Sequence, residues 1–197
     1  MPRTTMLRSR QPTMPPSSAK LTYDDFLHFP DDGLRHELID GVHYVTPSPA
    51  TVHQRLVGRL HVALYTYLEA RGRGEVFTAP FDVVLSIHDV VEPDLLVILS
   101  DQAEILTDAN VRGAPAIVIE IASPSTRRRD EGIKRKLYER VGVQEYWFVD
   151  PARRSVTVWQ RPGGSSRADA PRTLAAGDQL TTALLPGFSL SLAKLFR

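Results

Sequence analysis

Two acidic residues stand inside strand-like apolar segments, where a charged side chain needs a specific partner. Glu120 interrupts an apolar run over residues 116–122, and Asp94 opens a second apolar segment at residues 95–99. A buried carboxylate is costly unless a cation or a hydrogen-bond donor compensates it. A helix-like segment that contains Lys134 follows the first run. Two acids and a lysine at such positions predict a site for a divalent metal ion, and therefore an enzyme.

The composition fits one globular domain. The chain has 197 residues, enough for one sizeable core, and 42% of them are hydrophobic. No apolar run approaches the roughly 18–20 residues of a membrane span, so no membrane partner is expected. The absence of cysteine excludes disulfides, zinc–thiolate sites and thiol catalysis, and it fits a reducing cytoplasm.

Residues 1–20 differ in character from the rest of the chain. They carry four basic residues, no acid, and several prolines and serines, without the apolar core of a signal peptide. We expect a disordered basic arm here, followed by a single domain over residues 21–197. The net charge of the chain is +1, which leaves about −3 for the domain without the arm. Because nucleic-acid capture by charge alone normally requires a distinctly basic protein, composition leaves such binding open.

Helices and short strands alternate along the chain. The expected helical segments are residues 23–28, 51–71, 101–111 and 127–141. The end of the chain is expected to form one weak strand and a short helix, residues 190–196. The expected strands are residues 35–40, 42–46, 75–78, 81–86, 94–99, 115–122, 145–149 and 155–160. The Asp40-Gly41 pair is a typical hairpin turn, and residues 163–172 are expected to form a polar loop. Helices interleaved with strands, several of them in hairpins, indicate a mixed α/β fold.

The helix spacing brings Lys134 toward Glu120. In the helix 127–141, the apolar positions expected to be buried are Ile133, Leu137 and Val141. The residues beside this stripe are Asp130, Lys134 and Tyr138. They follow one another at intervals of four, so they share one side of the helix. Lys134 is therefore expected at the edge of the buried side, within reach of Glu120, although Lys136 is an alternative functional lysine.

The order of these motifs resembles a known family. The matching residues are Glu37-Leu-Ile-Asp40-Gly41, Pro93-Asp94, Ile119-Glu120-Ile-Ala-Ser-Pro-Ser-Thr, Asp130, Lys134, Tyr138, and Glu145-Tyr-Trp with Asp150. Over about residues 21–160 they resemble the bacterial restriction-endonuclease-like proteins long catalogued as a domain of unknown function. The resemblance implies the PD-(D/E)xK nuclease fold, a central mixed β-sheet flanked by helices, with Mg²⁺-dependent cleavage of phosphodiester bonds.

The resemblance also implies roles for individual residues. Asp94 corresponds to the aspartate of the motif and Glu120 to its second acid. The position of the motif's lysine holds Ala122, and in this family the lysine is displaced to the helix, which points to Lys134. Glu37 matches an additional acid of such nucleases. The expected catalytic residues are Asp94, Glu120 and Lys134, and the expected metal ligands are Glu37, Asp94, Glu120 and the backbone carbonyl of Ile121.

The implied chemistry suits these residue types. Mg²⁺ prefers oxygen ligands at about 2.0–2.1 Å and keeps several waters, so two or three carboxylates suffice, and Mn²⁺ is an alternative ion. A bound metal polarises the scissile phosphate and lowers the pKa of an attacking water. A lysine beside that water orients it or offsets developing charge. DNA is the expected substrate, and because related nucleases often dimerise, a homodimer is left open.

Each candidate position also has a structural alternative. Asp94 can bond a turn amide, and Glu120 can pair with an arginine. Glu37 can be a surface charge of the hairpin, and Lys134 can be a solvated helix residue. The six histidines form no i, i+4 pair, so no zinc site is expected, although His53 at the start of the long helix can face the cleft.

Two functions of different classes therefore stay open. The first is a metal-dependent DNA nuclease. The second is a catalytically inactive module that binds nucleic acid or a partner on the same fold, an alternative supported by the modest charge and the ambiguous lysine. A metal-dependent phosphohydrolase of smaller substrates is a third. The basic run at residues 127–129 borders the expected site, where it can meet phosphate.

Overall fold

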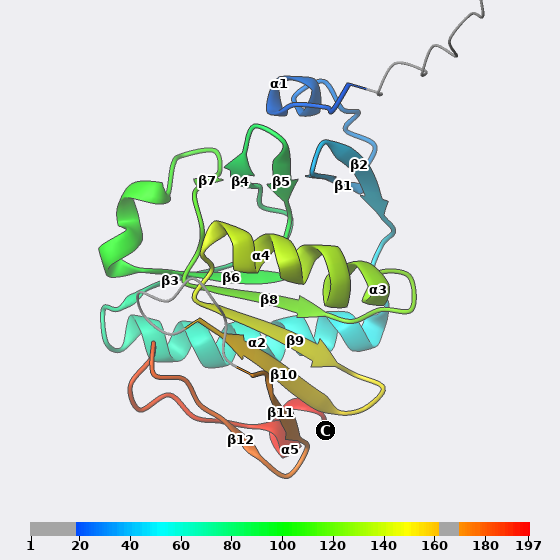
Figure 1. The fold of residues 1–197 in the computed structure, drawn as a ribbon. Coiled ribbons are helices and arrows are strands. Elements are labelled where there is room, and N and C mark those ends of the chain that lie inside the picture. The colour runs from blue at the N-terminus through cyan, green and yellow to red at the C-terminus, as the bar shows by residue number, and fades with distance from the viewer. Residues whose placement is uncertain (1–18, 162–169) are drawn as a thin grey trace, which may run out of the picture.

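A six-stranded sheet forms the centre of the computed structural model, which describes residues 19–161 and 170–197 (Figure 1). Its strand order is β11-β10-β9-β8-β6-β3. The strands are β3 (Gly74–Thr78), β6 (Leu95–Leu99), β8 (Ile117–Ile121), β9 (Glu145–Asp150), β10 (Ser155–Gln160) and β11 (Arg172–Ala175). Strands β8 and β9 run parallel, whereas the other neighbours pair antiparallel, so the predicted mixed sheet is confirmed.

A smaller five-stranded sheet lies above the large one in Figure 1, in the order β2-β1-β5-β4-β7. Its strands are β1 (Arg35–Ile39), β2 (Val42–Thr46), β4 (Val83–Ser86), β5 (Asp89–Val91) and β7 (Val111–Arg112). Asp40 and Gly41 both have positive φ, 51° and 74°, as the predicted tight hairpin between β1 and β2 requires. A third pair of short strands consists of β12 (Gln179–Leu180) and β13 (Leu190–Ser191).

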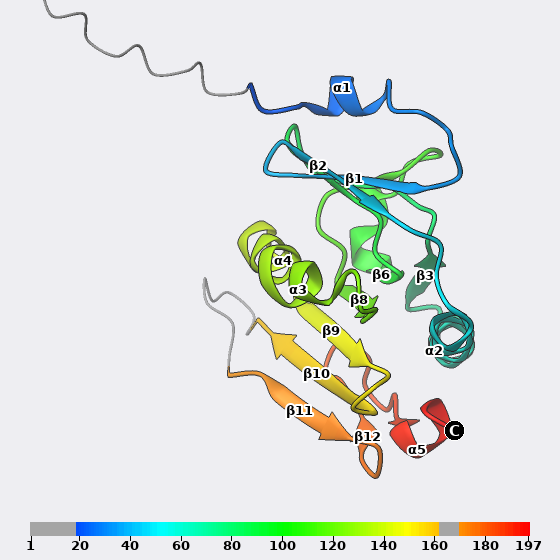
Figure 2. The ribbon, with the colours of Figure 1, turned by 90° about the vertical axis from the view of Figure 1, so that its right-hand side faces the viewer.

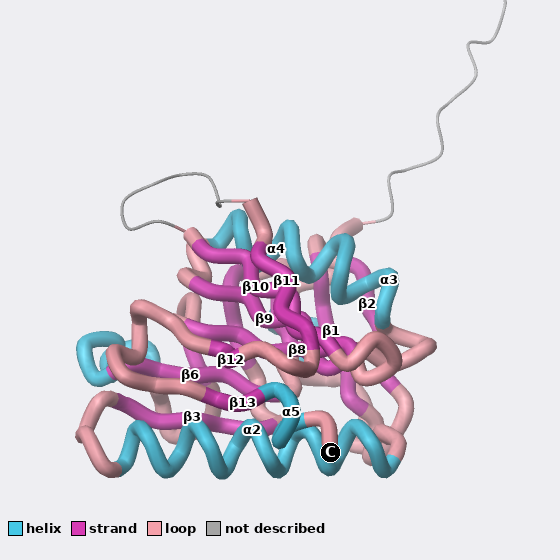
Figure 3. Tube along the Cα trace, turned by 90° about the horizontal axis from the view of Figure 1, so that it is seen from below, coloured by secondary structure: helices cyan, strands magenta, loops and turns pink. Residues whose placement is uncertain are grey.

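The helices lie around both sheets, and those beside the large sheet cover its two faces (Figures 1 and 3). They are α1 (Tyr23–Phe26), α2 (Thr51–Glu69), the 3₁₀ helix η1 (Ser100–Ile105), α3 (Arg127–Arg129), the π-helical segment η2 (Asp130–Lys134), α4 (Arg135–Val141) and α5 (Leu192–Leu195). Figures 1 and 3 show α2 along one face and α3–α4 along the other. Among the described residues, no helix is long and apolar enough to cross a membrane.

The strand β8 separates two hydrophobic clusters. On one side, the leucines of α2 pack against its isoleucines; the residues are Leu56, Leu60, Leu64, Leu68, Ile117, Ile119 and Ile121. On the other side, Val118 and Ala122 pack with Leu137 and Tyr138 of α4. The alternation confirms that neighbouring side chains of β8 face opposite ways. Glu120 therefore points to the side of α4, in the position that the strand pattern predicts.

The helical segment after β8 buries a different side from the one that the sequence predicted. Ile133 was expected in the core but is 39% exposed, whereas Asp130 and Lys134 are each only 2% exposed. One reason is that η2 is π-helical, and its wider i→i+5 turns rotate the side chains relative to an α-helix. The other is that both charged side chains have partners beneath the helix, described below, which offset the cost of burial.

Short strands are the elements that the sequence did not predict. Strands β5, β7, β11 and β12 have two to four residues, too few to show a two-residue period. The expected polar loop 163–172 lies mainly outside the described residues, and β11 already begins at Arg172. The expected arm also lies outside them up to residue 18, whereas Lys20 is described and pairs with Asp40 at 2.5 Å.

The observed side of the helix predicts different costs for two apolar truncations. Leu137→Ala should lower the free energy of unfolding by about 2–5 kcal/mol, because it leaves a cavity in the core. Ile133→Ala should cost less than about 1 kcal/mol, because that side chain keeps much of its contact with solvent. Urea denaturation of both variants measures this difference. Equal losses would mean that Ile133 is buried after all.

Candidate active site

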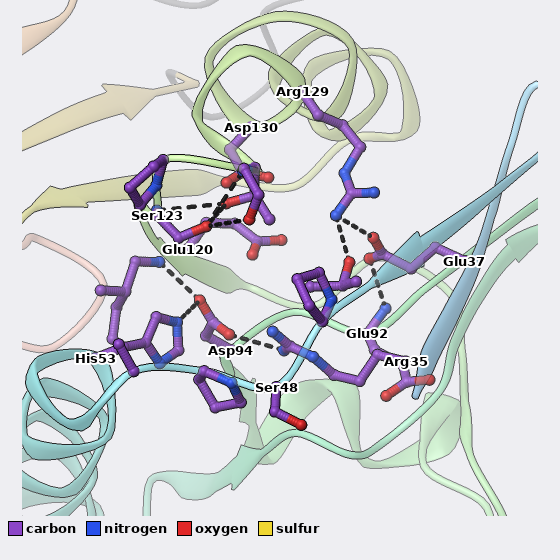
Figure 4. A pocket seen from close by; sticks show the side chains of 18 of the residues that line it. Arg35, Glu37, Ser48, His53, Glu92, Asp94, Glu120, Ser123, Arg129 and Asp130 are labelled. Atoms are coloured by element: carbon purple, nitrogen blue, oxygen red, sulfur yellow. Dashed lines mark hydrogen bonds and ion pairs between the residues drawn. The ribbon is translucent and has the colours of Figure 1, made fainter. Parts of the chain in front are cut away.

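A cavity of about 160 Å³ gathers the residues that the sequence singled out (Figure 4). Glu37 comes from β1, Asp94 stands just before β6, Glu120 comes from β8, and Lys134 ends η2. All four line this cavity together with Ile121. The expected catalytic residues therefore share one cleft, although they are spread over about 100 positions of the chain.

Lys134 links two of the carboxylates. Its Nζ lies 2.7 Å from Oε1 of Glu37 and 2.5 Å from Oε1 of Glu120. Burial lowers the pKa of Lys134, but Glu120 and Glu37 outweigh this effect, so its net pKa is raised and the side chain stays protonated. Lys134 and Glu37 are each 2% exposed, which excludes both the solvated-lysine and the surface-charge alternatives.

Glu120 is held by a lysine and a tyrosine rather than by an arginine. The hydroxyl of Tyr138 donates to Oε1 of Glu120 at 2.7 Å, beside the contact with Lys134. Burial raises the pKa of Glu120 to about 8, and the neighbouring carboxylate of Asp130 adds to this effect. Burial also raises the pKa of Tyr138 well above its ordinary value, so its hydroxyl remains a donor.

Asp94 accepts three hydrogen bonds. Arg35 Nη1 donates to Oδ1 at 2.8 Å, while the amide of Ile121 at 2.8 Å and Nε2 of His53 at 2.9 Å contact Oδ2. Burial raises the pKa of Asp94, but His53 and Arg35 outweigh burial and the net pKa is lowered. The amide of Ile121 belongs to a neighbouring strand rather than to a turn. Asp94 is thus a fixed carboxylate, and His53 faces the cleft as the sequence suggested.

Arg35 and Glu92 of the cavity were not assigned a role from the sequence, whereas Arg129 belongs to the basic run 127–129 that was expected to border the site. Arg35 contacts Asp94, and Nη2 of Arg129 lies 3.3 Å from Oε2 of Glu37. Glu92 also lines the cavity, and burial, with the nearby carboxylate of Asp82, raises its pKa to about 7. Two sequence features could have indicated these residues. Glu92 stands next to the Pro93-Asp94 motif, and Arg35 precedes Glu37 by two positions, which places both on one face of β1.

The residues present suit a hard divalent cation in kind. The cavity contains several carboxylates, and Oε2 of Glu37 and Oε2 of Glu92 are buried without a hydrogen-bond partner among the described residues. Burial is the main cause of the raised pKa values of Glu92 and Glu120, and neighbouring carboxylates raise them further. Within residues 19–161 and 170–197, however, no three acidic or histidine side chains are arranged as a metal-binding group. The carboxylates are instead paired with basic side chains.

The raised pKa of Glu92 predicts a specific dependence of stability on pH. Burial raises the pKa of Glu92 to about 7 in the folded protein, whereas the unfolded chain releases this proton near the ordinary pKa of 4.5. Wild-type stability therefore falls through this interval as pH rises. Since glutamine cannot ionise, Glu92→Gln should gain on the order of 1–3 kcal/mol relative to the wild type between pH 5 and pH 7.

Thermal unfolding in a chelating buffer at several pH values measures this gain. Glu75→Gln, at an exposed position of β3, is the matched control and should follow the wild type throughout. Parallel pH profiles for Glu92→Gln and the wild type would show that Glu92 is already ionised in the folded protein near pH 5.

Comparisons with known proteins agree with the geometry. A solved structure, described as a putative nuclease belonging to DUF820 from Anabaena variabilis, is similar over 89% of this chain and 97% of that chain, with a TM-score of 0.75. At 19% sequence identity this likeness shows the fold. A comparison with curated proteins found no match.

A family model gives the more specific result. The model described as "Uma2: Putative restriction endonuclease" matches residues 23–193, which include both sheets and every residue of the cavity. The mixed α/β fold and the predicted family are therefore confirmed. The chain belongs to the Uma2 family of restriction-endonuclease-like proteins.

Proposed function

We propose that this protein is a metal-dependent nuclease that hydrolyses phosphodiester bonds in DNA. The observation that supports this proposal most strongly is the convergence of Glu37, Asp94 and Glu120 in one cavity with the protonated Lys134. An acid-lined cavity with a buried ammonium group suits a reaction that needs both a hard cation and a fixed positive charge.

The carboxylates of Asp94 and Glu120 would hold Mg²⁺ or Mn²⁺, with Glu37 and the carbonyl of Ile121 as further ligands. A bound ion would polarise the scissile phosphate and lower the pKa of the attacking water. The amide of Ile121, Arg35 and His53 fix the carboxylate of Asp94, so that this ligand is oriented before an ion arrives.

Lys134 acts as a fixed cation rather than as a base. Its raised pKa keeps it protonated at any working pH, so it cannot remove a proton from water. Its Nζ instead donates hydrogen bonds toward the reacting phosphate and offsets the charge that develops there. Tyr138 donates to the same Oε1 of Glu120 that Lys134 contacts, and it thereby helps to fix this carboxylate.

A catalytically inactive binding module is the second candidate. It is favoured by the pairing of Lys134 with two carboxylates and of Asp94 with Arg35, since these contacts complete the charge pairs without a metal. The two candidates differ in one measurable property, because only the nuclease turns over a phosphodiester.

Cleavage of DNA distinguishes the two candidates. The wild-type protein should cleave plasmid or single-stranded DNA in Mg²⁺ or Mn²⁺ and stop in EDTA, as judged by gel electrophoresis. Glu120→Gln should be inactive, because it loses a ligand charge while its shape is kept. The absence of cleavage on any DNA or RNA with either ion would favour the binding module.

The role of Lys134 is tested by comparison with its neighbour. Lys134→Met should reduce turnover by roughly 10² or more, the scale of losing one transition-state donor, with DNA binding nearly unchanged. Lys136→Ala is the matched control, because Lys136 is exposed on α4 and should leave turnover unchanged. Circular dichroism verifies that both variants are folded. Equal rates for the two variants would remove Lys134 from the mechanism.

A further inference from the structure

A second hollow lies beside the active site, between α2 and α5. It has a volume of about 550 Å³, and four of the ten residues that line it are basic, namely Arg55, Arg59, Lys194 and Arg197. None of its lining residues is acidic. We call this hollow the α2–α5 groove. Figure 3 shows the two helices side by side on the same face of the large sheet.

The α2–α5 groove is connected to the active site by a third hollow. This intermediate cavity, of about 300 Å³, shares Arg35, His53 and Asp94 with the active-site cavity. It also shares Gln54, in the first turn of α2, with the α2–α5 groove. The intermediate cavity thus adjoins the active-site cavity and reaches the α2–α5 groove at Gln54. In Figure 2 the beginning of α2 and the helix α5 lie below the hairpin β1–β2.

A glycine in the middle of α2 marks the same surface. Gly58 lines the α2–α5 groove, and a Cβ atom added there would meet no other atom within 4 Å. Glycine is among the least favourable residues inside a helix, and here no contact within the described part of the chain requires it. Close approach of a ligand to the backbone is one role for which glycine is used.

The basic side chains of the groove lack acidic partners. Among residues 19–161 and 170–197, Arg55, Lys194 and Arg197 form no ion pair, and all three are exposed. Arg59 donates to the carbonyl oxygens of Leu195 and Arg197, at 2.7 Å in both cases, and so holds α5 against α2. Uncompensated cations kept close together favour an anionic ligand.

We infer that the α2–α5 groove binds the phosphodiester backbone of a nucleic-acid strand that extends from the active site. This inference rests on the proposed nuclease function and adds the path of the substrate. Arg55 and Arg59 stand one helical turn apart, about 6 Å along α2. Neighbouring phosphates along one strand of B-DNA are separated by a similar distance, so the two arginines fit successive phosphates. Gly58 lies between them and lets the backbone approach the helix.

Binding of fluorescently labelled DNA to the full-length protein tests the groove. Anisotropy is measured in EDTA, with a 20-base-pair duplex and a single strand of the same length, at several salt concentrations. The double variant Arg55→Ala/Lys194→Ala should bind at least tenfold more weakly than the wild type. Its slope of log affinity against log salt should be shallower by about 1.4–1.8, as expected for two lost phosphate contacts.

The control carries the same loss of charge elsewhere. Arg73→Ala/Lys136→Ala removes two exposed basic residues outside the groove, and it should bind DNA as the wild type does. An equal loss in both double variants would mean that DNA responds to net charge only, which would overturn the inference. Wild-type affinity in the groove variant would overturn it as well, as would tighter binding of polyglutamate than of DNA.

Gly58→Gln tests close approach without changing charge. Because the added side chain meets open space and glutamine favours helix, the variant should unfold at the same or a higher temperature. Its affinity for DNA should nevertheless fall at least fivefold. Thr66→Gln, an exposed position of α2 outside the groove, is the control. Unchanged DNA affinity of a folded Gly58→Gln variant would show that the strand does not cross this turn.

A small substrate separates this inference from the proposed function. Bis(4-nitrophenyl) phosphate is too short to reach the groove, so its hydrolysis by the wild type in Mn²⁺ reports on the active site alone. If the wild type hydrolyses this diester and the groove variants bind DNA as tightly as the wild type, the proposed nuclease function stands and the inference about the groove is refuted. If the groove variants bind DNA more weakly but the wild type hydrolyses no diester, the inference about the groove stands and the proposed nuclease function is refuted.

Discussion

The structure depends on one buried contact, in which the ammonium group of Lys134 lies between the carboxylates of Glu37 and Glu120. Each of the three side chains would be costly to bury alone, and removing one partner of a buried pair typically costs about 3–5 kcal/mol. Glu37 belongs to the small sheet, Glu120 to the large sheet, and Lys134 to the helical segment above them. The contact therefore fixes how these three parts pack, as well as the chemistry of the cavity.

The carboxyl groups of the cavity differ in their pKa values. Burial raises the pKa of Glu92 to about 7 and that of Glu120 to about 8, whereas His53 and Arg35 lower the pKa of Asp94. A site built for stability alone would replace these groups with apolar side chains. Buried ionisable groups of this kind cost stability, and such a cost is common at functional sites.

The residues of the site were accessible from the sequence because a charge inside an apolar strand is conspicuous. Glu120 and Asp94 were recognised in this way, and the strand and helix periods gave their neighbours on β8 and α2 correctly. Glu92 was not recognised, since its burial depends on the second sheet, whose short strands leave no period. Ile133 was placed wrongly, because α-helical spacing does not anticipate a π-helical segment that turns Lys134 inward. Local spacing thus predicted most helices and strands, whereas the pairing of charges distant in sequence determined which side chains are buried.

The proposed metal site requires the carboxylates of Asp94 and Glu120 to bind the ion while Lys134 remains its neighbour. An anomalous difference map from a crystal soaked in Mn²⁺ tests it most directly. One anomalous peak for Mn²⁺ is expected in the active-site cavity, at coordination distance from Asp94 and Glu120, with Lys134 still in the same cavity. A well-ordered crystal without anomalous density there, in a soak that shows Mn²⁺ bound elsewhere, would contradict it.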